Sequence, residues 1–216
     1  MNIAIFGASG ETGKLLTRRC IDAGNNVTAL VRTPSRFHVP AEPPNRIRII
    51  AGNAFDPSAV RQTIDGADVV LSALGARSLK REDVLERAVP LIISAMQQTG
   101  VRRIIVLGSA GAVPTSLDKQ PAWRRWFAKK ILYKTLMKWP VASQISQWNN
   151  LSNSNLDWTM VMPPMLTNGP PRGTYRIDGN ALPPYGSRIS RADIADFMMQ
   201  QIDNQQWIRK GVYLSW

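Results

Sequence analysis

The sequence predicts an α/β protein in which a doubly wound parallel sheet carries helices on both faces. Short apolar runs of strand length alternate along the chain with stretches of helical periodicity. The links between them are short and rich in glycine, proline and asparagine, which is typical of a sheet built from strand–helix–strand units. With 216 residues, the chain suits a single domain with a full core.

The strands are predicted from apolar runs that end in glycine, asparagine or a charged residue. Some are nearly all apolar, which indicates strands buried on both faces of the sheet. The expected strands cover residues 3–6, 27–31, 46–50, 68–74, 103–107, 157–162, 173–177 and 211–215.

Capping residues delimit the expected helices. Asp56 precedes a proline at the first helical position, and Ser190 with Asp193 forms a capping box. Gly100 ends the longest helix, in which an interruption is expected near Pro90. The expected helices cover residues 15–23, 57–64, 82–98, 141–154 and 190–202.

Three glycines spaced three residues apart separate the first strand from the first helix. Gly7 permits a tight turn, Gly10 lets the backbone approach a pyrophosphate, and Gly13 lets the helix pack closely on the strand. The N–H groups of the first helical turn then face the anion. The motif predicts a dinucleotide site, and a glycine-rich turn that binds nothing is the alternative.

The end of the second strand indicates which dinucleotide is bound. Arg32, Ser35 and Arg36 stand where proteins that prefer NAD carry an acidic residue for the ribose hydroxyls. An arginine at this place meets the 2′-phosphate of NADP instead. We therefore expect NADP(H) to be preferred over NAD(H), with a solvated loop of unconnected charges as the alternative.

Most of the net charge of +12 comes from residues 119–139, here called the basic segment. No acidic residue occurs between Asp118 and Asp157. On one straight helix, Lys130 and Lys134 would fall within the arc of the aromatic residues, so the faces do not separate cleanly. Three interpretations stay open: a helix over the site with solvated lysines, contact with an anionic membrane surface, and docking of an acidic protein. Nucleic-acid binding is not expected, since no recognised module accompanies the charge.

Composition excludes several other classes of protein. Cys20 is the only cysteine and His38 the only histidine, so neither an internal disulfide nor a zinc site of Cys and His ligands is possible; we expect no metal. No apolar run reaches the length of a membrane span, and no secretory leader precedes the first strand. We expect a cytoplasmic protein.

Several short motifs match those of a known family. They are Gly-Ala-Ser-Gly-Glu-Thr-Gly at 7–13, Leu-Val-Arg-Thr-Pro-Ser-Arg at 30–36, Gly-Ser-Ala at 108–110, Val-Met-Pro-Pro at 161–164, Gly-Thr-Tyr at 173–175, and Arg-Ile-Ser with Asp-Ile-Ala within 188–195. In these motifs the sequence resembles atypical short-chain dehydrogenases/reductases, which are NAD(P)H-binding proteins of the NmrA-like kind. The resemblance is greatest to the biliverdin-IX-beta reductase or flavin reductase branch. It runs from Met1 to about Asp203, with a gap over 115–150.

The resemblance implies a Rossmann-type fold, with a small C-terminal lobe on the substrate side at about 163–190. The implied contacts with NADP(H) are Gly7, Ser9, Gly10, Glu11, Thr12, Gly13, Arg32, Ser35, Arg36, Asn53, Ala54, Leu74, Gly75, Ser109 and Pro163. The implied contacts with substrate are Ala110, Pro164, Met165 and Leu166. Asn53 replaces an acidic residue of the family, and Met165 replaces a histidine of biliverdin reductase. The second change weakens the case for a tetrapyrrole substrate.

The usual acid–base pair of short-chain dehydrogenases is missing from the sequence. That pair is a tyrosine and a lysine four residues later, whereas Tyr133 is followed at that spacing by Met137. Reduction of a flavin or quinone does not need a strong protein acid, because the cofactor supplies the hydride. Ser109 is then the candidate catalytic residue, acting mainly by orienting the reactants.

Together, these features predict an NADPH-dependent reductase of a flat small-molecule acceptor such as a flavin or quinone, working without a Tyr–Lys dyad. The whole chain, residues 1–216, would form one nucleotide-binding domain. The alternative is a non-catalytic NADP(H)-binding sensor or assembly factor that docks an acidic partner or membrane through the basic segment. An epimerase or dehydratase is a third reading, less favoured because it also usually needs the dyad.

Overall fold

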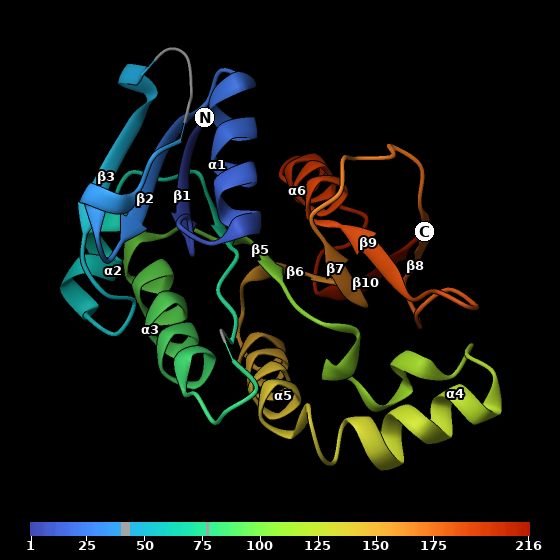
Figure 1. The fold of residues 1–216 in the computed structure, drawn as a ribbon. Helices are drawn as coiled ribbons and strands as arrows, with labels where there is room; N and C mark the ends of the chain where they lie inside the picture. The colour runs from blue at the N-terminus through green and yellow to red at the C-terminus, as the bar shows by residue number, and fades with distance from the viewer. Residues whose placement is uncertain (40–43, 77) are drawn as a thin grey trace.

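A computed structural model of the chain describes residues 1–39, 44–76 and 78–216. Its centre is one mostly parallel sheet with strand order β3-β2-β1-β4-β5-β6-β10-β8 (Figure 1). The strands of this sheet are β1 (Asn2–Phe6), β2 (Asn26–Val31), β3 (Ile47–Ala51), β4 (Val69–Ser72), β5 (Arg103–Leu107), β6 (Asp157–Met162), β8 (Arg176–Asp178) and β10 (Lys210–Ser215). Within it, only β8 runs antiparallel to its neighbour. The strand order reverses between β1 and β4, which confirms the expected doubly wound Rossmann-type sheet.

Helices cover both faces of the sheet, as expected. They are α1 (Glu11–Asp22), α2 (Pro57–Ile64), α3 (Val84–Thr99), α4 (Ala122–Phe127), α5 (Lys138–Ser152) and α6 (Arg191–Gln200). Alternate residues of β1 point to opposite faces: Ile3 and Ile5 pack with the core of α1 and α6, and Ala4 and Phe6 with the core of α2, α3 and α5. The apolar strands are therefore buried on both sides.

The capping signals act largely as the sequence predicts. The carboxylate of Asp56 accepts the N–H of Ser58 at 2.9 Å, and the hydroxyl of Ser190 accepts the N–H of Asp193 at 2.9 Å. The expected interruption at Pro90 is wrong, because α3 continues through it. Pro90 faces solvent while Val89 beside it is buried, so packing of the inner face holds the helix together.

A second, two-stranded parallel sheet lies apart from the main sheet. It pairs β7 (Met165–Thr167) with β9 (Arg188–Ser190) and was not predicted, because three residues are too few to show alternation. Figure 1 shows these strands beside α6. The strand expected at 173–177 is β8, which begins three residues later and extends the main sheet.

The basic segment does not form one straight helix, which was one of the geometries considered for it. After α4, residues Ala128–Leu132 form a π-helical turn, and α5 already begins at Lys138. The N–H of Tyr133 bonds the carbonyl of Ala128 at 2.9 Å, a span of five residues. No residue of α4 or of this turn is buried, so no apolar stripe enforces regular α-helical geometry.

None of the helices in the described ranges has the length and apolarity needed to cross a membrane.

Candidate functional site

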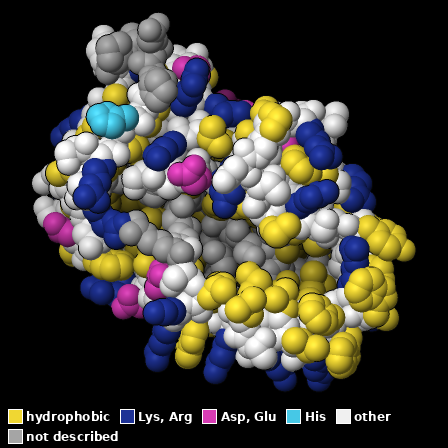
Figure 2. Space-filling view, in the orientation of Figure 1, with side chains coloured by type: hydrophobic (Ala, Val, Ile, Leu, Met, Phe, Trp, Pro, Cys, Tyr) yellow, Lys and Arg dark blue, Asp and Glu magenta, His cyan; other side chains and the backbone are white. Residues whose placement is uncertain are grey.

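The carboxyl ends of the parallel strands surround a cleft of about 1060 Å³. Figure 2 shows the hollow at the centre of this face. Among the residues expected in the site, those that line the cleft are Gly7, Ser9, Gly10, Glu11, Thr12, Arg32, Asn53, Ala54, Leu74, Gly75, Ser109, Pro163, Pro164, Met165 and Leu166. The volume is at the upper end of the range for ligand pockets, so the cleft has room for an extended ligand.

The three glycines of the first turn have different structural roles. Gly7 has a positive φ of 78°, and a Cβ there would lie 2.7 Å from the carbonyl carbon of Ala73. A Cβ on Gly13 would lie 2.0 Å from the carbonyl oxygen of Gly7. On Gly10, by contrast, the nearest atom would be 3.3 Å away. The fold itself therefore requires glycine at 7 and 13, whereas glycine at 10 mainly keeps the cleft wall open.

The N-terminus of α1 faces the cleft beside this turn. Gly10 is its N-cap and offers no side chain to the first-turn N–H groups, which also lack acceptors within the helix. Such groups and the helix dipole favour an anion. Glu11 lines the cleft but forms an ion pair with Lys14 at 3.6 Å, and Lys14 is not part of the wall.

The cations after β2 lie in two different places. Arg32 directly follows the strand and lines the cleft. Ser35 and Arg36 belong to the exposed 3-10 turn Pro34–Arg36, outside the cleft wall. A contact of Ser35 or Arg36 with a cofactor stays a prediction.

The middle of the cleft is lined by the ends of β3 and β4. The amide oxygen of Asn53 accepts the N–H of Phe55 at 3.3 Å, which leaves its NH₂ group as the donor for a ligand. Leu74 and Gly75 form the opposite part of the wall. A Cβ on Gly75 would meet nothing within 4 Å, so packing does not require glycine there.

Ser109 combines a structural contact with a place on the cleft wall. Its hydroxyl accepts the N–H of Gly111 at 3.4 Å and so caps a short turn after β5. The N–H of Ala110 bonds the carbonyl of Pro163 at 2.9 Å, which ties the ends of β5 and β6 together. Ala110, expected at the substrate, is buried and not part of the cleft wall.

Sequence reasoning missed the wall contributed by the helices. Its members include Arg81, Asp83 and Val84 at the start of α3, Met137, Pro140, Val141 and Gln144 around the start of α5, and Arg191 of α6. The α3 residues could have been found, because they follow the fourth strand at the same sheet edge. A helix over the site was one interpretation of the basic segment, but its pattern did not show which residues around the start of α5 would face the cleft.

The residues at the position of the usual Tyr–Lys pair differ in their surroundings. Met137 lines the cleft, whereas Tyr133 packs against the core, and burial raises the pKa of its hydroxyl. Lys134 and Lys138 are exposed, and no lysine of the described ranges lines the cleft.

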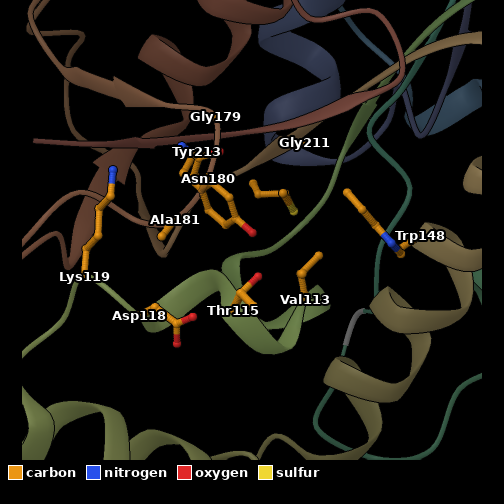
Figure 3. A pocket seen from close by; sticks show the side chains of 11 residues that line it. Val113, Thr115, Asp118, Lys119, Trp148, Gly179, Asn180, Ala181, Gly211 and Tyr213 are labelled. Atoms are coloured by element: carbon orange, nitrogen blue, oxygen red, sulfur yellow. The ribbon is translucent and has the colours of Figure 1, made fainter.

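A second, smaller cavity of about 410 Å³ lies between residues 113–119, α5 and β10. Figure 3 shows the ring of Tyr213 pointing toward Val113 and Thr115. Tyr213 is 2% exposed, and burial raises the pKa of its hydroxyl. This cavity shares no lining residue with the cleft and contains no part of the glycine turn, so the cleft is the candidate site.

Comparison with known proteins agrees with this geometry. The model of the NAD(P)H-binding family matches residues 7–205. A protein of Mycobacterium tuberculosis is 32% identical over 109 residues, which are 50% of this chain and 12% of that protein. The chain thus spans about one eighth of the length of this relative.

Two solved structures share the fold over nearly their whole length. A short-chain dehydrogenase/reductase from Veillonella parvula in complex with NADP is 21% identical, with a TM-score of 0.79 over 100% of this chain and 94% of that one. ChuY, an anaerobillin reductase from Escherichia coli O157:H7, is 19% identical, with a TM-score of 0.80 over 100% and 97%. The chain belongs to the NAD(P)H-binding family, and its fold is that of the short-chain dehydrogenases/reductases.

Proposed function

We propose that the protein is an NADPH-dependent reductase that delivers a hydride to a flat acceptor such as a flavin or a quinone. The observation that carries the proposal is the continuity of the cleft. One wall joins the glycine turn and Arg32 to Ser109 and the apolar residues after β6. A dinucleotide and an acceptor could therefore lie end to end.

The residues at the first end of the cleft suit a dinucleotide. Gly10 leaves open a cradle that a side chain would fill, and the uncapped N-terminus of α1 offers N–H groups to the pyrophosphate. Arg32 would bind the 2′-phosphate, with a bidentate guanidinium well matched to it. Asn53 would donate to the adenine edge. A bound nicotinamide supplies the hydride; the protein supplies position and electrostatics.

The other end of the cleft suits a flat, weakly polar acceptor. Its apolar lining residues are Met137, Pro140, Val141, Pro163, Pro164, Met165 and Leu166, and the polar residues Gln144 and Arg191 belong to the same wall. Such a wall favours stacking of a ring system and excludes water from one side of it. Ser109 would orient the acceptor by a hydrogen bond. Catalysis would rest on proximity and orientation, with the proton taken from water or a hydroxyl.

Turnover tests the proposal directly. Purified protein is mixed with NADPH, and the loss of nicotinamide absorbance is followed after addition of FMN or menadione. We expect acceptor-dependent loss that is slower with NADH. The matched variant Met165→Ala should raise KM for the acceptor and leave the affinity for NADPH unchanged, because Met165 belongs to the acceptor end.

A non-catalytic role is the second candidate, favoured by Met137 at the place of the usual lysine. In that case the protein would bind NADP(H) as a sensor or assembly factor. Tight binding of NADPH without turnover over a broad panel of flavins and quinones would contradict the reductase and favour the sensor. Absence of NADPH binding would contradict both.

A further inference from the structure

The basic segment exposes an unusual concentration of large apolar side chains. Trp123 is 68% exposed, Trp126 59% and Leu136 57%. The complete set, here called the aromatic face, is Trp123, Trp126, Phe127, Ile131, Leu136 and Trp139. Figure 1 shows α4 and the following turn at the edge of the molecule, away from the main sheet, and Figure 2 shows hydrophobic side chains gathered there with Lys and Arg around them. A patch of this kind marks an interaction surface.

Cations surround the aromatic face, and most of them have no carboxylate partner. Within the described ranges, Lys130, Lys134 and Lys138 form no ion pair, whereas Lys119 pairs with Asp178 and Lys129 lies 3.7 Å from the carboxylate of Asp118. Since the chain has no acidic residue between Asp118 and Asp157, the positive potential there is not offset locally.

The backbone of the segment brings apolar and cationic side chains onto one surface. The N–H of Met137 bonds the carbonyl of Leu132 at 2.9 Å, so residues five apart lie in successive turns. Ile131 and Leu136 are five apart, and both are exposed. Exposed tryptophans beside lysines are the composition of the membrane–water interface, where rings enter the headgroup layer and long lysine stems reach up to phosphates.

We propose that the aromatic face docks on an anionic membrane surface. Trp123, Trp126 and Phe127 would enter the boundary between headgroups and acyl chains, and Lys130, Lys134 and Lys138 would lie against lipid phosphates. The docking does not depend on the reductase activity proposed above. For a reductase, it would place the acceptor end of the cleft next to the membrane, because Met137 of the basic segment also lines the cleft.

Two other occupants fit the surface less well. Protein interfaces are depleted of lysine, and three of the five cations of the segment that form no ion pair among the described residues are lysines, the other two being Arg124 and Arg125. A second copy of the chain would bring two surfaces of the same strong charge together, which the net charge of +12 opposes. Charge complementarity therefore favours a lipid surface.

Vesicle flotation tests the proposal with the full-length protein. Vesicles of phosphatidylcholine alone are compared with vesicles that also contain phosphatidylglycerol. We expect binding only to the anionic vesicles and a strong decrease at high salt. The triple variant Lys130→Gln, Lys134→Gln, Lys138→Gln should bind about 100-fold more weakly, roughly fivefold for each lysine. The double variant Trp123→Ser, Trp126→Ser should lose about tenfold or more at unchanged charge.

The matched control removes three exposed cations elsewhere: Arg48→Gln, Arg61→Gln and Lys210→Gln. It has the same net charge as the lysine variant and should bind the anionic vesicles within about twofold of the wild type, since these residues lie outside the segment. The thermal midpoint of each variant shows that it is folded.

Three results would overturn the proposal. They are no binding to anionic vesicles, an equal loss in the control and the lysine variant, and an unchanged affinity in the tryptophan variant. Stronger binding to polyglutamate than to the vesicles would overturn it in favour of an acidic protein.

Discussion

The glycine turn at residues 7–13 and the basic segment at residues 119–139 are held in opposite ways. In the turn, backbone atoms lie so close that a single methyl group on Gly13 would meet a carbonyl oxygen at 2.0 Å. In residues 121–142, by contrast, no side chain is fully buried. The conformation of the glycine turn is thus fixed by local sterics, whereas the exposed surface of the basic segment is available for contact with a partner. Substitutions should therefore act on folding in the one and on association in the other.

The largest effect is expected at Gly13. Replacement by valine forces the side chain into the carbonyl of Gly7, and we expect a loss of about 3 kcal/mol or more of unfolding free energy. Urea denaturation measures the loss. The matched control is Gly10→Ala, whose Cβ would be 3.3 Å from the nearest atom and should cost little stability. If Gly13→Val is as stable as the wild type, the conformation of this turn is not fixed by steric contact at Gly13.

Asp193 is a buried polar residue whose replacement should also act on folding. Its carboxylate accepts the N–H groups of Arg172 and Gly173, the hydroxyl of Ser190 and the indole N–H of Trp216, at 2.8–3.2 Å. Asp193→Asn places an NH₂ group against some of these donors, and we expect a loss of about 2–3 kcal/mol in unfolding free energy. A loss close to zero in urea denaturation would show that the contacts do not hold this lobe.

The same residue predicts a dependence of stability on acid. Burial alone would raise the pKa of Asp193, but the hydrogen bonds from Gly173, Ser190, Arg172 and Trp216 outweigh it and lower the pKa. A carboxyl with a lowered folded-state pKa stabilises the protein above its unfolded value of about 3.9, and this contribution is lost as the pH falls through the folded value. We expect the wild type to lose stability more steeply below about pH 4 than Asp193→Asn. Parallel curves of stability against pH would contradict this.

Arg32 tests whether the cleft beside the turn distinguishes the two dinucleotides. Arg32→Ala should weaken NADPH by about 1.5–3 kcal/mol, the scale of a lost hydrogen bond to a charged group, and leave NADH nearly unchanged. Arg36→Ala is the control, since Arg36 lies outside the cleft wall, and its effect should be smaller. Titration calorimetry of both cofactors measures the difference. Equal losses for NADPH and NADH would refute the 2′-phosphate assignment.

The smallest effect on folding is expected in the basic segment. Lys130→Gln, Lys134→Gln and Lys138→Gln together should change the unfolding free energy by less than about 0.5 kcal/mol, because these side chains are exposed and unpaired among the described residues. Urea denaturation checks this. A loss above about 2 kcal/mol would mean that the segment is part of the fold's framework, as the glycine turn is.

The parts of the structure that could be predicted from the sequence are those fixed by local residues. Strands such as β5 and caps such as Asp56 carry their signal within a few residues, so the fold and the strand-end residues of the cleft could be placed. The helix interruption expected at Pro90 was wrong, because packing of the inner face of α3 outweighs the local effect of a proline. The register of residues 128–137 could not be predicted, since the π-helical turn has no sequence signature, so Met137 could not be assigned to the cleft wall although a helix over the site was one interpretation.

The most direct test of the account is equilibrium binding of NADPH to the wild type and to Gly10→Val. The isopropyl group would occupy the cradle that the glycine leaves open, while its Cβ would lie 3.3 Å from the carbonyl oxygen of Gly7, a much looser contact than the 2.0 Å at Gly13. We expect the wild type to bind NADPH, and NADH more weakly, whereas Gly10→Val should stay folded and show no measurable binding. A wild type that binds neither cofactor, or a folded Gly10→Val variant with unchanged affinity, would contradict the central claim that this turn holds a dinucleotide.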